Sequence, residues 1–330
     1  MKAIQLQAFG KQSESLRLVE VPDVGAPGPD EVILALEASP ITGSDLSVIA
    51  GSYGQLPALP SIGGFEGVGR VVAVGRDVTF LAEGELTLIP PLQPAWAERI
   101  KSRADWLRPL PDGDVKQLSM LGINPATAYL MLTETVSLAP GAWVIQNAAN
   151  SAVGRAVIAI ARSRGLRTVN VVRRPELIEE IEAIGGDVVL VDGPDLAQQV
   201  AKATSDAPVV LALDTIGGDA TLRLMSAVAQ GGSVVMYGNV SRQPLQASVP
   251  QLVFTDLTIR GFWLVEWFKT ATLDKLVPMY EELADLVASG AITVPIAATY
   301  SFEQYADAID AAAQWQGKVL LTPHSDGLPS

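Results

Sequence analysis

The sequence predicts an α/β protein in which an irregular β domain is joined to a second domain built on a doubly wound parallel sheet. Three observations support this prediction. The chain has 330 residues, which exceeds the usual size of a single domain. Short β-like runs separated by Gly and Pro fill the first 120 residues, and beyond that point buried strands alternate with helical segments.

The first domain is predicted from runs such as Glu31–Leu36 and Val68–Val74, with turn-forming clusters such as Gly25–Pro29 between them. Residues 267 to 290 have the pattern of a helix, and residues 292 to 321 that of β pieces around one more helix. We expect this last part to return to the first domain. The predicted domains are residues 1–120, completed by 267–330, and residues 121–266.

The second domain is predicted from alternating strands and helices. Helices are expected at Val153–Arg164 and at Glu176–Ile184, which Gly185-Gly186 ends. The expected strands are Ala142–Gln146, Thr168–Val172, Val188–Val191, Val209–Leu213, Ser233–Tyr237 and Thr258–Phe262. Because strands and helices alternate, they form βαβ units, whose sheet is parallel and covered by helices on both faces.

The amino-acid composition limits the kinds of partner that the protein can bind. Hydrophobic residues make up 48% and charged residues 18%, as in a globular protein, and the net charge is −13. A chain this acidic repels a phosphate backbone, so we expect no nucleic-acid partner. No apolar run is long enough to span a membrane, and the start of the chain has the pattern of a strand rather than a targeting leader. We therefore expect a cytoplasmic protein without a membrane partner.

The chain has no cysteine and a single histidine, His324, in the polar stretch at its end. Disulfides, thiol catalysis and cysteine-containing metal sites are thereby excluded. The expected role of His324 is that of a solvated tail residue. We predict no bound metal.

A segment of small residues, Asn147–Gly154, follows the first strand of the second domain and opens its first helix. Such a turn lets the backbone approach a pyrophosphate, which the helix N-terminus then binds. Of the glycines in G-x-G-x-x-G only Gly154 is present, with Ala148 and Ser151 at other small positions. By itself the segment is equally compatible with an ordinary strand-to-helix turn.

The end of the next strand favours a cofactor and indicates which one. A site for NAD usually has Asp or Glu there to bind the ribose 2′-hydroxyl. Here Arg173 and Arg174 follow the strand instead, and guanidinium groups match a 2′-phosphate through charge-assisted hydrogen bonds. Two solvated surface arginines are the alternative, but that interpretation leaves the missing acid unexplained. We predict NADPH bound to a Rossmann-type domain.

Residues 39–75 resemble the N-terminal, GroES-like domain of the medium-chain dehydrogenase/reductase superfamily. Zinc-dependent members have Cys-x-x-Asp and Gly-His-Glu, where this chain has Thr42-Gly43-Ser44-Asp45 and Gly64-Phe65-Glu66. Thr42 and Phe65 thus replace the metal ligands. Without a Lewis acid, reduction of an activated C=C bond is favoured, because the carbonyl of the substrate itself takes up the negative charge. A tyrosine can then supply the proton.

Over nearly the whole chain the sequence is most similar to the mitochondrial-type trans-2-enoyl-thioester reductases. The matching motifs are Ala50–Gly54, Gly63–Gly67, Asn124–Tyr129, Gln146–Ser151, Asn170–Arg173 and Gly261–Leu264. The resemblance implies that Tyr53 donates the proton, although a half-buried anchor is the other interpretation of a Tyr in such a loop. It also implies a set of residues around the cofactor and the substrate: Asn124, Thr127, Asn150, Ser151, Ala152, Val153, Arg173, Arg174, Tyr237, Gly238, Asn239, Phe262, Trp263, Leu264 and Lys318.

We therefore expect a homodimeric, zinc-independent, NADPH-dependent oxidoreductase that reduces the C=C bond of 2-enoyl thioesters carried on CoA or an acyl carrier protein. Alternatives are a quinone oxidoreductase-like enzyme, a reductase of a small activated alkene such as a haloacrylate, and an NADPH-binding sensor or structural protein without turnover. Thr42-Gly43 and Phe65 depart from the common pattern near the expected site, so they bear on the substrate. Asp45 and Glu66 are interpreted as structural ion-pair or hydrogen-bond partners.

Overall fold

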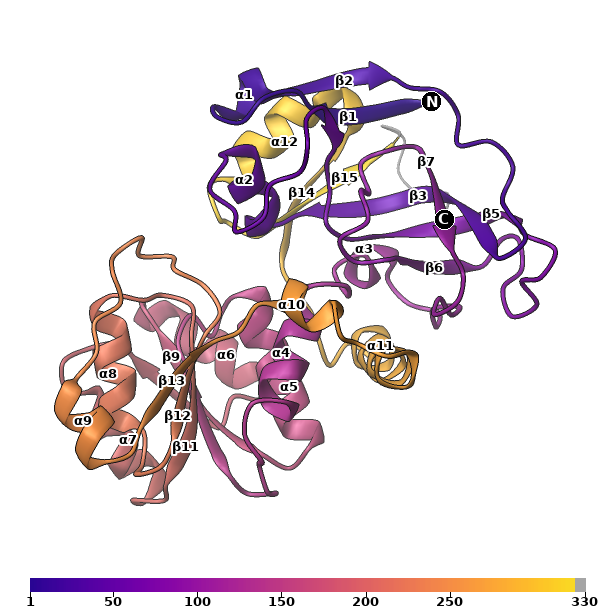
Figure 1. The fold of residues 1–330 in the computed structure, drawn as a ribbon. Helices are drawn as coiled ribbons and strands as arrows, with labels where there is room; N and C mark the ends of the chain where they lie inside the picture. The colour runs from indigo at the N-terminus through magenta and orange to yellow at the C-terminus, as the bar shows by residue number, and fades with distance from the viewer. Residues whose placement is uncertain (324–330) are drawn as a thin grey trace. The chain divides into compact units, whose positions relative to one another are not determined.

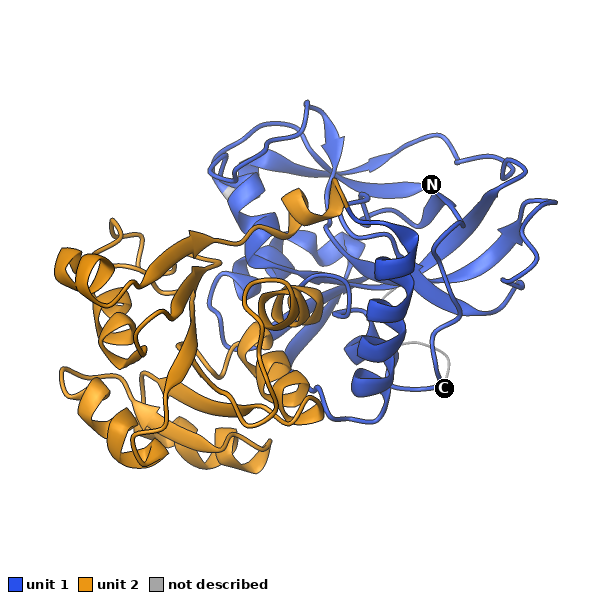
Figure 2. Cartoon of the chain, turned by 60° about the horizontal axis from the view of Figure 1, so that its bottom comes forward, with its two compact units in different colours: residues 1–123, 271–330 blue, residues 124–270 orange. Residues whose placement is uncertain are grey.

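The computed structural model describes residues 1–323, so His324 lies outside the described residues. The chain forms two compact units, which Figure 2 distinguishes by colour. Unit 1 comprises Met1–Ile123 and Ala271–Ser330, and unit 2 comprises Asn124–Thr270. In the described part of the chain, none of the helices combines the length and the apolar character needed to cross a membrane.

Unit 2 is built on a six-stranded sheet of order β10-β9-β8-β11-β12-β13, in which every neighbouring pair is parallel. Its strands are β8 (Trp143–Gln146), β9 (Arg167–Val172), β10 (Val188–Val191), β11 (Val209–Asp214), β12 (Ser233–Met236) and β13 (Thr258–Gly261). This confirms the predicted parallel sheet, with strand ends shifted by a residue or so. The order reverses between β8 and β11, and such a switch point is where doubly wound sheets bind ligands.

Helices cover both faces of this sheet. Figure 1 shows α7, α8 and α9 along one side of the strands and α4, α5 and α6 along the other. These helices are α4 (Asn124–Thr133), α5 (Ala152–Ser163), α6 (Ile178–Ala183), α7 (Leu196–Thr204), α8 (Asp219–Ala227) and α9 (Val249–Phe254). Because both faces are covered, β8 and nearly all of β9 are buried.

Unit 1 contains two sheets. One has the order β14-β15-β3-β5-β6, with β7 also paired to β3, and the other the order β2-β1-β4. The strands are β1 (Lys2–Leu6), β2 (Leu16–Glu20), β3 (Glu31–Ile41), β4 (Ser61–Ile62), β5 (Gly67–Val74), β6 (Leu86–Ile89), β7 (Arg99–Arg103), β14 (Ile296–Ser301) and β15 (Lys318–Thr322). Helix α12 (Tyr305–Ala312) lies between β14 and β15 in the chain, as predicted for residues 292 to 321. Short helices α1 (Gln12–Ser15), α2 (Gly43–Ile49) and α3 (Val115–Leu118) also interrupt this β domain.

The helix predicted at about residues 267–290 is confirmed over Leu273–Ala288, but its predicted start is wrong. The structure has two helices there, α10 (Leu264–Phe268) in unit 2 and α11 (Leu273–Ala288) in unit 1. Between them the chain crosses from one unit to the other after Thr270, and the extended backbone of Thr272 (φ −104°, ψ 158°) starts the second helix. The sequence has a helical pattern on both sides of the crossing, so the pattern does not show where one helix ends and the next begins.

The Gly63-Gly64 pair of the matching motif makes room for Trp96, the largest fully buried side chain of unit 1. A Cβ on Gly63 would lie 2.4 Å from Trp96 Cε3, and one on Gly64 2.6 Å from Trp96 Cδ1. The indole Nε1 donates to Ser39 Oγ (3.1 Å), which donates in turn to the carbonyl oxygen of Glu66 (2.6 Å). The motif therefore holds the backbone around Glu66 in place.

Candidate active site

The turn after β8 has the geometry of a site where backbone and ligand meet closely. Ala148 adopts the left-handed region (φ 48°), a conformation that the usual fingerprint assigns to glycine. Ser151 caps α5, its hydroxyl accepting from the amide of Gly154 (3.1 Å). A Cβ on Gly154 would lie 2.5 Å from the carbonyl oxygen of Ala149, so only glycine fits there. The turn is therefore tight where the fingerprint requires it to be.

Two buried amide side chains, Gln146 and Asn170, hold this turn in place through hydrogen bonds. The Gln146 Nε2 group donates to Asn170 Oδ1 (2.8 Å) and to the carbonyl oxygen of Gly154 (2.9 Å). Asn170 Nδ2 donates to Thr168 Oγ1 (2.9 Å) and the carbonyl oxygen of Val188 (3.2 Å). These bonds join β8, β9 and β10 to the first turn of α5. Sequence reasoning missed this role, although a polar residue inside each of two apolar strands was its signal.

Asp214 holds the loop that follows the neighbouring strand β11. Sequence reasoning missed this role as well. The buried carboxylate of Asp214 accepts from Asn147 Nδ2 (2.6 Å), from the hydroxyl of Thr221 (2.5 Å), and from the amides of Ile216 and Gly217 (2.8 and 3.0 Å). Asn147 Oδ1 accepts in return from the amide of Thr215 (3.0 Å). The loops after β8 and β11, on either side of the switch point, are thus fixed to each other.

Most of the predicted cofactor residues follow directly on strands of this sheet. Asn150 to Val153 come after β8, Arg173 and Arg174 after β9, Tyr237 to Asn239 after β12, and Phe262 to Leu264 after β13. Because all six strands are parallel, these segments lie at the same, carboxyl-terminal edge of the sheet. Asn124 and Thr127 lie instead in the first turns of α4.

Several of these groups have the environment that a ligand requires. Arg173 and Arg174 are exposed, and neither forms an ion pair with another residue of the described chain. The Nδ2 atom of Asn124 is buried and finds no hydrogen-bond acceptor within residues 1–323. Gly238 approaches Thr215 so closely that a Cβ would lie 2.2 Å from its hydroxyl. The residues present therefore fit a dinucleotide with a 2′-phosphate.

In unit 1, Thr42 stands where zinc-dependent relatives have a metal ligand, and it is the N-cap residue of α2. The Thr42 hydroxyl donates to Asp45 Oδ2 (2.6 Å), and the amide of Thr42 donates to the same oxygen (2.7 Å). The amide of Asp45 donates back to the Thr42 hydroxyl (3.2 Å), which completes a capping box at the start of α2. Within residues 1–323 no cluster of three or more His, Cys, Asp or Glu side chains could hold a metal ion.

Glu66 and Asp45 are buried carboxyl groups of unit 1, and both interact electrostatically with the half-buried Lys318. Burial raises the pKa of Glu66 to about 7 and that of Asp45 to about 6. Burial also lowers the pKa of Lys318, and the charges of Glu66 and Asp45 oppose that shift. Lys318, predicted to reach the cofactor, belongs to unit 1, and its near charged neighbours there are these two carboxyl groups.

Tyr53 lies in the loop after α2, half-buried against the core of unit 1. Its ring meets Phe65 edge to face, with the centroids 5.3 Å apart and the planes at 70°. Phe65, at the position of the second metal ligand in zinc-dependent relatives, therefore supports the tyrosine that the resemblance assigns to proton transfer.

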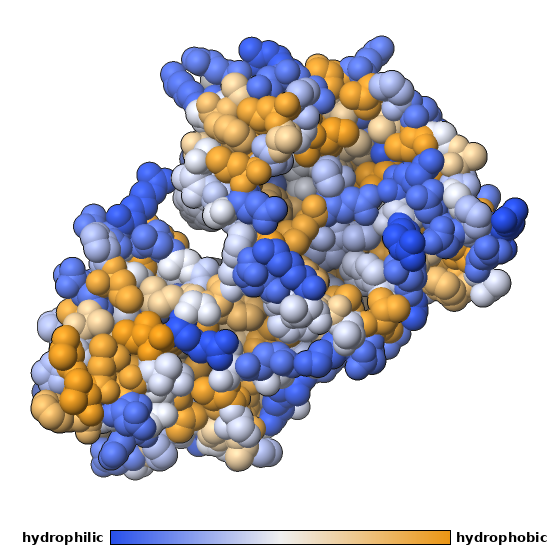
Figure 3. Space-filling model, in the orientation of Figure 1, coloured by the Kyte–Doolittle hydropathy of each residue, from blue (hydrophilic) through white to orange (hydrophobic). Residues whose placement is uncertain are grey.

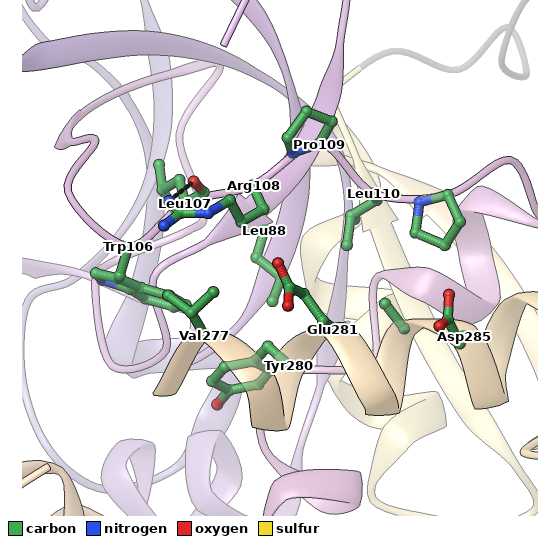
Figure 4. A pocket seen from close by; sticks show the side chains of 12 residues that line it. Leu88, Trp106, Leu107, Arg108, Pro109, Leu110, Val277, Tyr280, Glu281 and Asp285 are labelled. Atoms are coloured by element: carbon green, nitrogen blue, oxygen red, sulfur yellow. Dashed lines mark hydrogen bonds between the residues drawn. The ribbon is translucent and has the colours of Figure 1, made fainter. Parts of the chain in front are cut away.

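Unit 1 also has a cavity of about 410 Å³ between the segment 106–111 and α11 (Figure 4). Leu88, Leu107, Leu110, Val277 and Ala284 contribute apolar walls, and Glu281 and Asp285 lie at the exposed side. None of the predicted site residues lines it. The cavity and the predicted site are separate features.

The fold and the turn together define a class: a Rossmann-type dinucleotide-binding domain attached to a GroES-like β domain, the architecture of medium-chain dehydrogenases/reductases. The family model described as "Alcohol dehydrogenase GroES-like domain" matches residues 28–141, and that described as "Zinc-binding dehydrogenase" matches residues 152–282. A human protein named "Enoyl-[acyl-carrier-protein] reductase, mitochondrial" is 37% identical over 94% of this chain and 85% of its own length. The bovine protein of the same name is 36% identical, over 94% of this chain and 86% of its own length.

Solved structures agree with this architecture. A structure described as a putative NADPH:quinone reductase from Bacillus thuringiensis superimposes with a TM-score of 0.87 at 27% identity, covering 98% of this chain and 99% of its own. An enoyl thioester reductase mutant from Candida tropicalis shares the fold with a TM-score of 0.86 at 24% identity, over 97% and 99% of the two chains. The chain belongs to the medium-chain dehydrogenase/reductase superfamily and, within it, to the enoyl-thioester reductase family. It is an oxidoreductase.

Proposed function

We propose that the protein reduces the C=C bond of 2-enoyl thioesters with NADPH. The cofactor is supported by one observation above all: two exposed arginines, without an ion pair to any residue of 1–323, follow β9 beside a turn in which only glycine fits at position 154. The substrate class is supported by the relatives named as enoyl-acyl-carrier-protein reductases, which match 94% of this chain. CoA and acyl-carrier thioesters are both compatible with it. A cytoplasmic location stays a prediction, and these relatives are named as mitochondrial.

The chemistry assigns separate tasks to the cofactor and to the protein. NADPH, when bound, supplies a hydride, which adds to the β-carbon of the substrate. Asn124, Thr127, Ser151 and the backbone of the turn would bind and orient it, with Arg173 and Arg174 on the 2′-phosphate. Tyr53 would then give its proton to the α-carbon, and solvent would return a proton to the phenolate. One hydride and one proton saturate the double bond and leave NADP⁺.

The test follows NADPH oxidation by the purified protein with a medium-chain 2-enoyl-CoA, in parallel with a quinone. Fast turnover of the enoyl thioester is the expected result. The quinone is the second candidate because a structure described as a putative NADPH:quinone reductase superimposes with a TM-score of 0.87. Turnover of the quinone or of a haloacrylate alone would replace the proposed substrate, and NADPH binding without oxidation by any acceptor would support a sensor or structural protein.

Cofactor preference gives a second test. Replacing Arg173 and Arg174 together by alanine is expected to raise the Kd for NADPH about 100-fold or more, because two charge-assisted hydrogen bonds of about 1.5–3 kcal/mol each are lost. The Kd for NADH should change little, since it has no 2′-phosphate. Fluorescence titration with both cofactors measures this.

The matched control is Arg162→Ala, an exposed arginine in the last turn of α5, away from the carboxyl edge of the sheet. It should leave both affinities unchanged. Equal losses for NADPH and NADH in the double variant would show that the arginines do not recognise the 2′-phosphate.

A homodimer is the proposed assembly. Helix α9 buries none of its residues, and Val249, Val253 and Phe254 are 66%, 65% and 78% exposed. Figure 3 shows apolar side chains gathered over this helix at the lower left of the view. Beside it β13 is the outermost strand of the sheet, with a free edge. A second copy of the chain, related by a two-fold axis, would cover the apolar side chains and pair with this edge.

Light scattering after size exclusion should therefore give twice the chain mass of 34.8 kDa. Phe254→Glu should shift the protein to the monomer, because a carboxylate cannot be buried in an apolar interface without large cost. Leu273→Glu, on an exposed leucine of unit 1, should remain dimeric. A monomeric wild-type protein at micromolar concentration would refute the dimer.

A further inference from the structure

The chain leaves unit 1 through the short segment Gly122–Ile123, and the next residue, Asn124, begins α4. Two side chains of unit 1 hold this segment. One carboxylate oxygen of Glu66 accepts a hydrogen bond from the amide of Ile123 (2.7 Å), and the hydroxyl of Tyr280 donates to the carbonyl oxygen of Gly122 (2.7 Å). Both a backbone donor and a backbone acceptor of the segment are therefore bonded to residues distant in the sequence. We call these two hydrogen bonds, from Glu66 and Tyr280, the grip on the segment.

The packing leaves this segment little freedom. A Cβ on Gly122 would lie 3.1 Å from the Cβ of Glu66 and 3.3 Å from Cγ of Pro91. Glu66 is fully buried, and Tyr280 is buried with its ring against Trp106, the centroids 5.4 Å apart. Figure 4 shows Tyr280 and Trp106 at one end of the cavity beside α11. Both partners of the segment are therefore rigidly placed.

We propose that Glu66 is a positioning residue for cofactor binding, whose carboxylate fixes the Gly122–Ile123 backbone and through it the first turn of α4. That turn carries Asn124, with its unpaired buried Nδ2 atom, and Thr127. The inference rests on the proposed function, since it is there that Asn124 and Thr127 are assigned to the cofactor. The grip itself is a property of the free protein.

The surroundings of Glu66 give the grip a pH dependence. Asp45 on α2, Lys318 on β15 and Tyr280 on α11 all interact electrostatically with it. Burial and, to a smaller extent, the charge of Asp45 raise the pKa of Glu66, while Lys318 and the amides of Ile123 and Gly122 oppose the shift, and the net pKa is about 7. The ionised form is the stronger acceptor, so the hydrogen bond to Ile123 strengthens as the pH rises through 7. Overall stability moves the opposite way, because a raised carboxyl pKa favours the folded state below it.

Hydrogen exchange of the full-length protein without cofactor tests the grip. Amide protection in the 122–123 segment, corrected for the intrinsic exchange rate, is measured at about pH 6 and about pH 8. Exchange here is expected through local opening of the segment while Glu66 stays buried, so the wild type should be better protected at the higher pH. Glu66→Gln keeps an acceptor of the same shape but cannot ionise, so its corrected protection should not change with pH. Glu66→Leu should lose protection at both values, by about tenfold or more at the higher pH, where the lost hydrogen bond is the stronger one.

Two further variants separate the grip from its neighbours. Tyr280→Phe removes only the bond to the Gly122 carbonyl and should leave the pH response of the Ile123 amide intact. Asp45→Asn should lower the midpoint of that response, since a charge that raises the pKa of Glu66 is gone. A pH response that survives in Glu66→Gln, or unchanged Ile123 protection in folded Glu66→Leu, would overturn the proposal. If Glu66→Leu does not fold, the Gln variant decides alone.

The Kd for NADPH tests whether Glu66 contributes to cofactor binding. Glu66→Leu should raise the Kd for NADPH, and Glu66→Gln should restore it to near the wild-type value and make it independent of pH. If the exchange results hold but the Kd values do not follow them, Glu66 holds the segment without positioning the cofactor site. If the wild type itself binds no NADPH, the proposed function fails while the exchange results still stand.

Discussion

Replacing Tyr53 by phenylalanine is expected to lower kcat for a 2-enoyl-CoA by about 10²- to 10⁴-fold, the usual worth of a positioned general acid. The substitution removes one hydroxyl and keeps the ring, whose edge-to-face contact with Phe65 at 5.3 Å should hold the loop in place. The Kd for NADPH and the free energy of unfolding should therefore stay near their wild-type values. Steady-state kinetics, cofactor titration and chemical denaturation measure the three quantities.

The control is Tyr305→Phe, which removes the hydroxyl of another half-buried tyrosine in unit 1, one that donates to the carbonyl oxygen of Leu16 (3.3 Å). It should not change kcat. Product formed by wild-type enzyme in D₂O should carry deuterium at the α-carbon. If the Phe variant keeps its full rate with the enoyl thioester, Tyr53 is an anchor of the loop and another group or water supplies the proton.

Replacing Gly154 by alanine is expected to cost about 1–3 kcal/mol of folding free energy and to weaken NADPH binding at least tenfold. The added Cβ would lie 2.5 Å from the oxygen and 2.7 Å from the carbonyl carbon of Ala149. These are backbone atoms that cannot rotate away, so the turn itself must move. Alanine favours a helix over glycine by about 1 kcal/mol, but at this distance the clash exceeds that gain.

Gly193→Ala provides a matched control in the same unit. A Cβ there meets only the Asp195 carboxylate, at 3.2 Å, and Asp195 is exposed and free to turn. Its stability should stay within about 0.5 kcal/mol of wild type, and its NADPH affinity should not change. Thermal denaturation and fluorescence titration of both variants decide. Wild-type NADPH affinity in a folded Gly154→Ala protein would mean that the turn does not approach the cofactor.

The elements that could be predicted are those whose signal is local. β10 was predicted residue for residue, and the other strands of unit 2 to within a residue or two, because each is a short apolar run between turn residues. The start of the helix predicted at about 267–290 was wrong because the range includes the end of α10, which belongs to unit 2, as well as α11, which belongs to unit 1. The spacing of apolar residues shows which face of a helix is buried. It does not show against which hydrophobic core that face packs.

The candidate site shows the same division. Arg173 and Arg174 stand out in the sequence because an expected acid is missing, and the importance of Gly154 follows from its place in the fingerprint. Asp214 was missed because its main partner, Asn147, is 67 residues away, and Gln146 because it bonds to Asn170 across the sheet. Buried polar groups of this kind are recognised only when their partners are known, since an unpaired group in the same place would be strongly destabilising.

By itself the sequence determined what chemistry the chain can carry. With no cysteine and one histidine it has no typical zinc site, and its alternating apolar runs dictate a parallel sheet with two arginines at one edge. The tertiary structure alone decided how the site is held: Thr42 as the cap of α2, Asp214 between two loops, and Glu66 on the segment that leads to α4. Side-chain types are local and can be read along the chain. Hydrogen bonds between distant residues exist only once folding has brought their atoms within about 3 Å of each other.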